Sequence, residues 1–125
     1  MKQLFIFYTL ISLIPIAHSQ SQSEMNMDAL KSFNVQKTEE QAILDSTLEL
    51  ATPEQQQKLH RLQKLHDEYV RLYTSLYFEG HTGSVRPMCA SYVQANLTRE
   101  HTEKLKDLSF REEGNVCSPV WMFRD

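Results

Sequence analysis

The stretch that decides the fold is residues 52–78, which read TPEQQQKLHRLQKLHDEYVRLYTSLYF. Thr52 and Gln55 form a capping box, in which a hydroxyl and a side-chain amide each satisfy a backbone N–H at the start of a helix. Pro53 stands at the first helical position, where its missing N–H costs nothing. No Gly or Pro follows within the stretch, so it predicts a helix about 39 Å long. Gly80, just beyond it, suits a left-handed cap.

The apolar residues of this predicted helix form a seam with the 3-4-3-4 spacing of packed helix pairs. They are Leu62, Leu65, Tyr69, Leu72 and Leu76. Toward the C-terminal end the seam is widened by Val70, Tyr73, Tyr77 and Phe78. The stripe of Tyr69, Tyr73 and Tyr77 has two interpretations. It could lie centrally in the domain with its hydroxyls at the rim, or it could be a binding face, because Tyr is enriched at interfaces.

A second capping box precedes this helix at Thr38-Glu39-Glu40-Gln41. Behind it, Ile43, Leu44, Leu48 and Ala51 share one helical face. The pattern predicts a helix over 39–51 that meets the long helix in a corner or an αα-hairpin at Thr52. Residues 20–37 begin with a polar run and are expected to be flexible or weakly helical.

The two cysteines, Cys89 and Cys117, shape the expectation for the C-terminal part. One straight helix over 89–110 would separate Cys89 from Phe110 by about 32 Å. The seven steps from there to Cys117 span at most about 25 Å, so a disulfide would close only at full stretch. We therefore predict a helical hairpin that turns at Asn96-Leu97-Thr98, with Thr98 as an N-cap, and a Cys89–Cys117 bridge. An interchain bridge and two free thiols are the alternatives.

The first 19 residues have the layout of a secretory signal peptide. A short, weakly positive start is followed by an apolar run over 4–17 and by small residues before Gln20. The apolar run is shorter than the roughly 20 residues that a membrane-spanning helix needs. We expect cleavage after Ser19 and a secreted, extracellular product with no membrane span. The remaining chain divides into an N-terminal segment over 20–37 and a helical domain over 38–125.

Composition narrows the class of protein further. The 125 residues are 41% hydrophobic and 23% charged, with a formal net charge of −3. Basic and acidic residues are interspersed, which excludes the clustered basic face of a nucleic-acid-binding protein. Three Gly and four Pro exclude a low-complexity chain, and two Cys cannot build a disulfide-dense scaffold. Few large aliphatic residues remain after Ser19, so the expected core is thin.

Two further features suit an exported chain. Asn96-Leu97-Thr98 is an acceptor tripeptide for N-glycosylation, and the predicted turn would expose it. The tail over 117–125 contains Trp121, the only Trp, within the apolar run Val120-Trp121-Met122-Phe123. This run could dock on the helical hairpin and complete the core, or it could bind a receptor groove, since Trp is a leading hot-spot residue.

Catalytic and metal-binding signals are weak. Four histidines remain beyond the signal peptide, namely His60, His66, His81 and His101. None has a metal-binding spacing, and no nucleophile or phosphate-loop motif is present. We interpret the four as solvated residues on helix surfaces that titrate near pH 6.5. The sequence therefore predicts no enzyme, no metal site and no cofactor.

These observations predict an all-α protein, a small helical bundle of three to four helices with one disulfide. Its predicted function is to bind an extracellular protein partner, with Tyr69, Tyr73, Tyr77 and Trp121 as the candidate binding residues. The alternative is an extracellular carrier with a cavity for a hydrophobic ligand, lined by Tyr69, Leu72, Tyr73, Phe78 and Trp121. A homodimer through the seam is a third hypothesis. The short seam, with Lys58 at its next position, favours a monomer.

Overall fold

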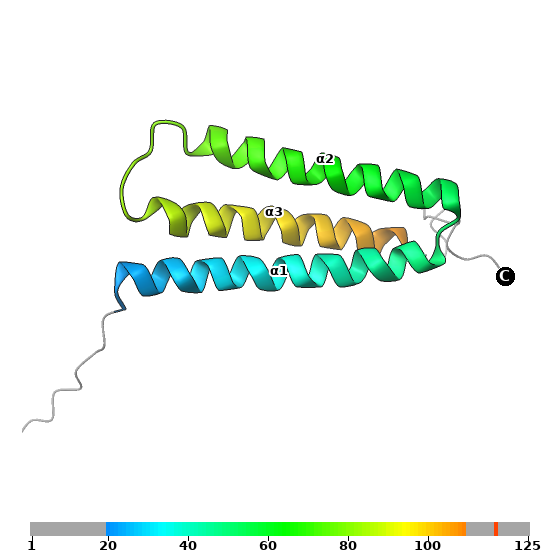
Figure 1. The fold of residues 1–125 in the computed structure, drawn as a ribbon, viewed down its shortest axis with the longest axis horizontal. Coiled ribbons are helices and arrows are strands. Elements are labelled where there is room, and N and C mark those ends of the chain that lie inside the picture. Colours follow the sequence, from blue (N-terminus) through cyan, green and yellow to red (C-terminus); the bar gives the residue numbers. More distant parts are fainter. Residues whose placement is uncertain (1–19, 110–116, 118–125) are drawn as a thin grey trace, which may run out of the picture.

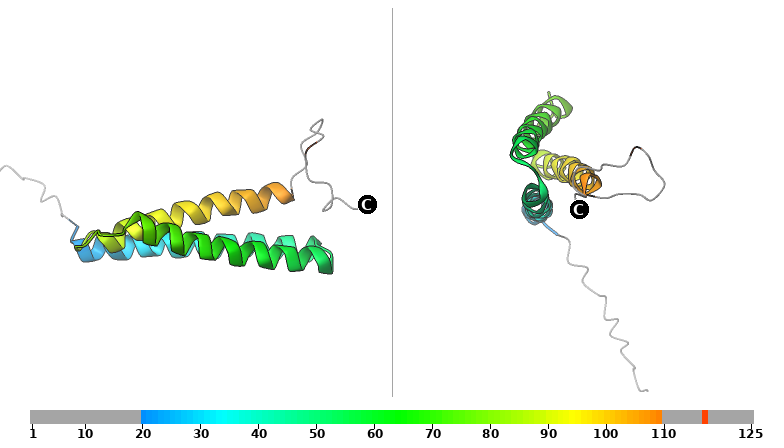
Figure 2. Two further views of the ribbon diagram at one scale, coloured as in Figure 1. Left: turned by 90° about the horizontal axis from the view of Figure 1, so that it is seen from above. Right: turned by 90° about the vertical axis from the view of Figure 1, so that its right-hand side faces the viewer.

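The computed structural model describes residues 20–109 and residue 117. This part of the chain contains three helices and no strand: α1 (Gln22–Leu50), α2 (Pro53–Tyr77) and α3 (Arg86–Leu108). Figure 1 shows that α2 runs back along α1 and that α3 returns in the direction of α1. Viewed end-on, the three helices lie at the corners of a triangle (Figure 2, right). The prediction of an all-α helical bundle is confirmed.

Helix α1 begins 17 residues before the predicted start at residue 39. The Ser21 hydroxyl accepts from the backbone N–H of Glu24, and the Glu24 carboxylate accepts from the backbone N–H of Ser21. This capping box fixes the start of the helix within a run expected to be flexible or weakly helical. Thr38 is not a cap but lies inside α1, where its hydroxyl donates to the carbonyl of Asn34.

Helix α2 follows the sequence-based prediction closely. Thr52 is its N-cap and forms the predicted capping box with Gln55, at N–O distances of 2.8 and 3.3 Å. The helix ends at Tyr77, with Phe78 as C-cap. Gly80 has φ of +78°, a left-handed conformation in which Gly carries no side-chain penalty.

Helix α3 is continuous through the predicted turn, so the helical hairpin at Asn96-Leu97-Thr98 is wrong. Thr98 is buried within the helix, and its carbonyl accepts from the Thr102 hydroxyl at 2.9 Å. No Gly or Pro lies between Pro87 and the end of α3. The predicted turn rests mainly on the presumed disulfide, and Thr98 as an N-cap is a weak signal without a Gly or Pro nearby.

The predicted Cys89–Cys117 disulfide is not present. Cys89 is half-buried near the start of α3, and Cys117 is exposed. The straight helix carries the chain about 28 Å away from Cys89 by Leu108. The nine steps from Leu108 to Cys117 span at most about 31 Å, so a bridge would require a nearly extended return.

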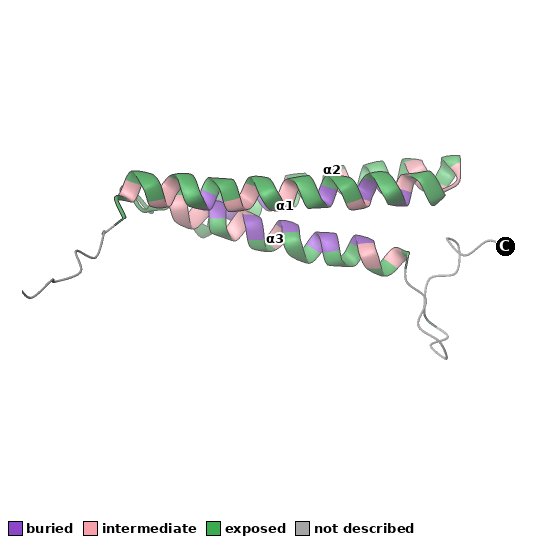
Figure 3. Ribbon diagram, turned by 90° about the horizontal axis from the view of Figure 1, so that it is seen from below, coloured by how far each residue is buried: buried purple, intermediate pink, exposed green. Residues whose placement is uncertain are grey.

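The core lies mainly between α1 and α3, which pack along most of their length (Figure 1), whereas α2 packs less closely on either. The buried positions of α3 repeat at intervals of four and three residues, as in helix-pair seams. They are Ser91, Ala95, Thr98, Thr102 and Leu105, and His101 next to Thr102 is also buried. Most of these side chains are small or carry a hydroxyl, which lets helices approach closely. Figure 3 shows that the face of α1 turned away from this contact is mostly exposed.

Apolar contact among all three helices is concentrated at one end of the bundle. Leu44 of α1, Leu59 of α2 and Leu105 of α3 form a buried cluster, each with less than 5% of its surface exposed. At roughly 2 kcal/mol per buried Leu, this cluster is a small core for three long helices. The thin core expected from composition is therefore observed.

Several predicted features lie outside the described residues. They are the signal peptide over 1–19 and the C-terminal run with Trp121. Within the described part, no helix is both long and apolar enough to cross a membrane.

Candidate functional site

The most extensive exposed apolar surface of the described chain lies along α2. We call it the Leu/Tyr face; it comprises Leu62, Leu65, Tyr69, Leu72, Tyr73, Leu76 and Tyr77. Between 39% and 70% of each of these residues is exposed to solvent. The seam predicted to pair with another helix is therefore present in the sequence but is not covered in this structure.

The reason is the side that α2 turns toward its neighbours. Its buried residues are Leu59, Val70 and Thr74, with Gln63 and His66 half-buried between them. Because successive residues are rotated by about 100° around a helix, this stripe lies roughly a third of a turn away from the seam of Leu62, Leu65, Tyr69, Leu72 and Leu76. α2 thus has two distinct faces. One combines polar and apolar residues and packs against the other helices, and the other is apolar and faces solvent.

The three tyrosines of the Leu/Tyr face form a continuous ladder. The ring centroids of Tyr69 and Tyr73 are 5.7 Å apart, and those of Tyr73 and Tyr77 are 6.0 Å apart. These separations are typical of favourable aromatic pairs. Neighbouring rings limit the rotamers of each side chain, so less side-chain entropy is lost when a partner covers the ladder.

The summed exposure of the Leu/Tyr face approaches the area that one partner buries in a protein interface. From the exposed fractions of its seven residues and the usual areas of such side chains, it presents on the order of 700 Å² of accessible surface. The largest apolar patch of a typical monomer is about 300–600 Å². A standard protein–protein interface buries about 800 Å² on each partner.

A second site lies at the centre of the bundle, where α1, α2 and α3 contribute polar side chains. Glu40 of α1 is only 2% exposed. Its Oε1 accepts from Lys37 Nζ and, at 2.9 Å, from Gln63 Nε2 of α2. Although burial opposes it, the Glu40 hydrogen bond and charge raise the pKa of Lys37. Glu40 is therefore a charged group inside the bundle that is held by partners from two helices.

Two histidines from different helices complete this central cluster. The rings of His66 of α2 and His101 of α3 are stacked, with centroids 3.8 Å apart and planes at 9°. His101 Nε2 also lies 3.1 Å from Oε1 of Gln63. Burial and the neighbouring His66 lower the pKa of His101 to about 4. Burial likewise lowers the pKa of His66, although Glu40 and Asp67 oppose the shift.

One contact in the cluster is incomplete. Nε2 of His66 and Oε2 of Glu40 are 3.8 Å apart, beyond hydrogen-bond distance, and neither atom has a hydrogen-bond partner among residues 20–109 and 117. The interpretation of His66 and His101 as solvated surface residues is wrong. Sequence spacing could not pair them, because they lie on separate helices and are brought together only by the packing of α2 on α3.

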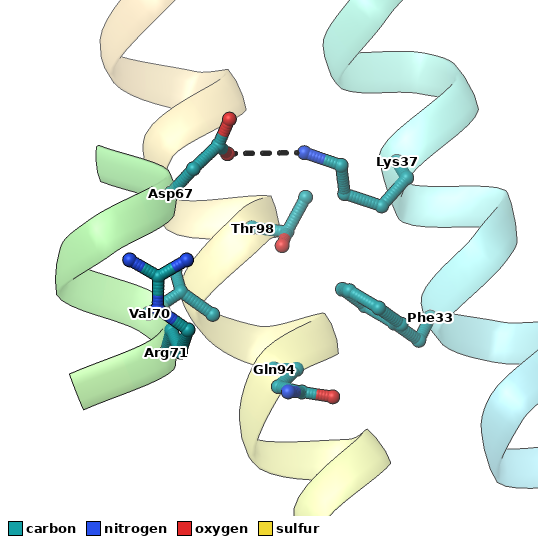
Figure 4. A pocket seen from close by; sticks show the side chains of 7 residues that line it. All are labelled: Phe33, Lys37, Asp67, Val70, Arg71, Gln94 and Thr98. Atoms are coloured by element: carbon teal, nitrogen blue, oxygen red, sulfur yellow. Dashed lines mark hydrogen bonds and ion pairs between the residues drawn. The ribbon is translucent and has the colours of Figure 1, made fainter. Parts of the chain in front are cut away.

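A groove beside this cluster runs between the three helices (Figure 4). It encloses about 390 Å³ and is lined by Phe33, Lys37, Asp67, Val70, Arg71, Gln94 and Thr98. Lys37 of α1 bridges it to Asp67 of α2 at 3.3 Å, drawn as the dashed line. The groove marks where α1 and α2 are joined by an ion pair instead of apolar packing.

The predicted site residues thus fall in separate places. Tyr69, Tyr73 and Tyr77 lie together on α2, whereas Asn96 is exposed on α3, where its side chain accepts from Arg99 at 3.0 Å. Cys89 borders a pocket of about 340 Å³ near the α2–α3 loop, together with Tyr77 and Tyr92. Trp121 lies outside the described residues.

Neither a metal centre nor a known relative defines the site. Within residues 20–109 and 117, no group of three or more His, Cys, Asp or Glu side chains is placed to hold a metal ion. Comparisons with protein-family models, curated protein sequences and solved structures find no match for the chain. The geometry of the Leu/Tyr face and the central cluster is therefore the basis for a functional proposal.

Proposed function

We propose that this chain is a secreted helical interaction protein that binds an extracellular protein partner through the Leu/Tyr face of α2. The observation that carries the proposal is the exposure of the whole seam from Leu62 to Leu76. An isolated exposed Leu is ordinary, but a contiguous apolar surface of this size usually marks an interaction site.

The spacing of the Leu/Tyr face favours one kind of partner. Residues at intervals of three and four match the anchors that an amphipathic helix inserts into a complementary surface. The seam from Leu62 to Leu76 extends over about 21 Å, or four turns of a bound helix. The tyrosine hydroxyls could form hydrogen bonds to the polar rim of such a helix, as is common at interfaces.

Export is supported by the sequence alone. The layout of residues 1–19 fits a cleaved signal peptide, and we propose an extracellular location on that basis. The exposure of Asn96 on α3 supports a glycan there. The carrier hypothesis has less support, because Tyr69 and Leu72 are more than half exposed and so do not line an enclosed cavity.

The test is binding by two matched variants. Leu65→Glu/Leu72→Glu places two charges on the Leu/Tyr face, whereas the control Val35→Glu places one at a similarly exposed apolar position of α1. Each tagged protein is used to recover partners from extracellular fluid of the source organism, and the affinity of the recovered protein is then measured.

We expect the double variant to lose at least about 100-fold in affinity, since two buried charges at a helix interface cost several kcal/mol, while Val35→Glu binds like the wild type. Equal binding by the double variant would refute the proposed face. Recovery of lipid without protein would support the carrier instead. Recovery of a second copy alone would replace the extracellular partner with a homodimer.

A further inference from the structure

The middle of α2 is attached to the rest of the bundle by polar contacts. Gln63 Nε2 donates to Glu40 Oε1 of α1 at 2.9 Å and, within α2, to Asp67 Oδ1 at 3.1 Å. Lys37 Nζ reaches Asp67 at 3.3 Å, and His66 stacks on His101. The buried apolar side chains of α2 are few, namely Leu59 and Val70, with Phe78 just beyond its end.

We propose that the stacked pair of His66 and His101 is an acid-sensitive latch, and that protonation of both rings releases α2 from the α1–α3 pair. This inference concerns how α2 is held and does not rest on the identity of any binding partner. It predicts that acidification opens the bundle before α1 and α3 separate from each other.

The charges that face the two rings come from all three helices. Glu40 and Lys37 belong to α1, Asp67 belongs to α2 beside His66, and each histidine faces the other across the α2–α3 contact. With both rings neutral, two carboxylates and one ammonium give the cluster a charge of about −1 at neutral pH. A first proton on the rings balances this charge, although burial still disfavours it on either ring.

The second proton is different, because it places two cations face to face at a centroid distance of 3.8 Å. Both rings are shielded from bulk water, since His101 is 8% exposed and His66 is half-buried. Like charges this close repel strongly where water cannot screen them. Separation of α2 from α3 would relieve the repulsion and rehydrate both rings.

The direction of the pH dependence follows from the pKa values. Because burial and His66 lower the pKa of His101 from 6.5 to about 4, the open state binds its proton more readily than the closed state. The latch is therefore fully closed above about pH 6.5 and weakens as the pH falls toward 4. For His101 alone, the closed-to-open ratio falls by about 20-fold between pH 7 and pH 5.

α2 is the element that would move. It packs less closely on either neighbour than α1 and α3 pack on each other. The α1–α3 pair also keeps links that involve no histidine, such as the contact of Lys106 with Glu39 at 2.9 Å. Release of α2 would expose the groove between the three helices. It would also change the position of the Leu/Tyr face relative to α1 and α3.

The experiment is hydrogen exchange of the full mature chain at pH 7 and pH 5, read by mass spectrometry and corrected for the intrinsic pH dependence of exchange. We expect the protection of α2 amides near Gln63 to fall by at least about 20-fold, with α1 amides near Leu44 less affected. NMR titration of the same protein should show the His66 and His101 rings titrating below pH 6.5.

The controls separate the latch from a general effect of acid. His66→Gln/His101→Gln should abolish the pH dependence of α2 protection, whereas His60→Gln, at an exposed histidine of the same helix, should retain it. If the double variant does not fold, the wild-type titration and exchange decide the matter. Unchanged α2 protection at pH 5, or an equal loss in α1 and α2, would overturn the proposal.

Discussion

At the scale of single residues, Glu40 occupies a position that an apolar side chain usually takes. It is almost fully buried and accepts hydrogen bonds from Lys37 and Gln63, which come from two different helices. A buried carboxylate adds little net stability compared with a well-packed apolar group, but removing one member of such a network is costly. Through Gln63, Glu40 links α1 to α2 at one position, the kind of contact by which polar residues fix the register of some helix pairs.

Replacing this carboxylate should be much more harmful than replacing its neighbour. Glu40→Ala should lower the free energy of unfolding by about 3 kcal/mol, because it leaves polar partners unsatisfied and creates a cavity. Glu39→Ala removes an exposed ion pair with Lys106 and should cost less than about 1 kcal/mol. Urea denaturation followed by circular dichroism measures both. Equal losses would show that Glu40 is not buried in solution.

The sequence predicted the helix cap at the start of α2 but not the buried histidine pair. The capping pair Thr52 and Gln55 was recognisable because a cap is a local pattern with a fixed spacing. The stacked histidines were not, since His66 and His101 lie 35 positions apart in the chain and nothing in their local sequence marks either as buried. The sequence alone does not distinguish polar residues on a buried stripe of a helix from polar residues on a solvent-exposed stripe.

At the scale of elements, the difference between expectation and structure is clearest in α3. A presumed disulfide required a turn at residues 96–98, whereas local propensity favoured one uninterrupted helix, and local propensity was correct. In α1, two local capping patterns compete. Ser21 and Glu24 form the box that starts the helix, whereas the box predicted at Thr38 does not form. The presumed disulfide therefore predicted the course of α3 less well than local helix propensity did.

A proline at position 99 distinguishes the two arrangements of α3. If Thr98 were an N-cap, residue 99 would be the first helical position, where Pro is well accommodated. In the continuous helix, Arg99→Pro removes a backbone hydrogen bond and introduces a clash, and it should cost about 3 kcal/mol or more. The control Arg99→Ala loses one exposed contact with Asn96 and should change stability little.

Thermal unfolding of the Arg99 variants, compared at equal concentration, provides the measurement. A proline variant as stable as the alanine variant would favour the helical hairpin over the continuous helix. We expect a large loss of thermal stability in the proline variant alone, which would agree with a continuous α3.

At the scale of the whole molecule, the sequence predicted the helices of the bundle better than their packing. The seam on α2 was identified correctly as apolar and periodic, but it was expected to meet another helix, and it does not within the described chain. Periodicity shows which residues share a face, not what covers it. Coverage depends on how the helices are arranged, and the α1–α3 contact takes most of the packing.

The same arrangement explains why two kinds of site coexist on α2. Its inward side joins the polar cluster around Glu40, while its outward side leaves Leu72 and its neighbours in solvent. A helix attached by polar contacts and apolar on its outer side is suited to binding another helix. The Leu/Tyr face is therefore a surface and not part of the core.

The most direct test of that claim is the unfolding free energy of Leu65→Glu/Leu72→Glu, measured by urea denaturation of the isolated protein beside the wild type. If both side chains are exposed, as they are here, the variant should lie within about 1 kcal/mol of the wild type, since surface substitutions have small effects. A loss of several kcal/mol, or failure to fold, would place the Leu/Tyr face inside the molecule and contradict the account.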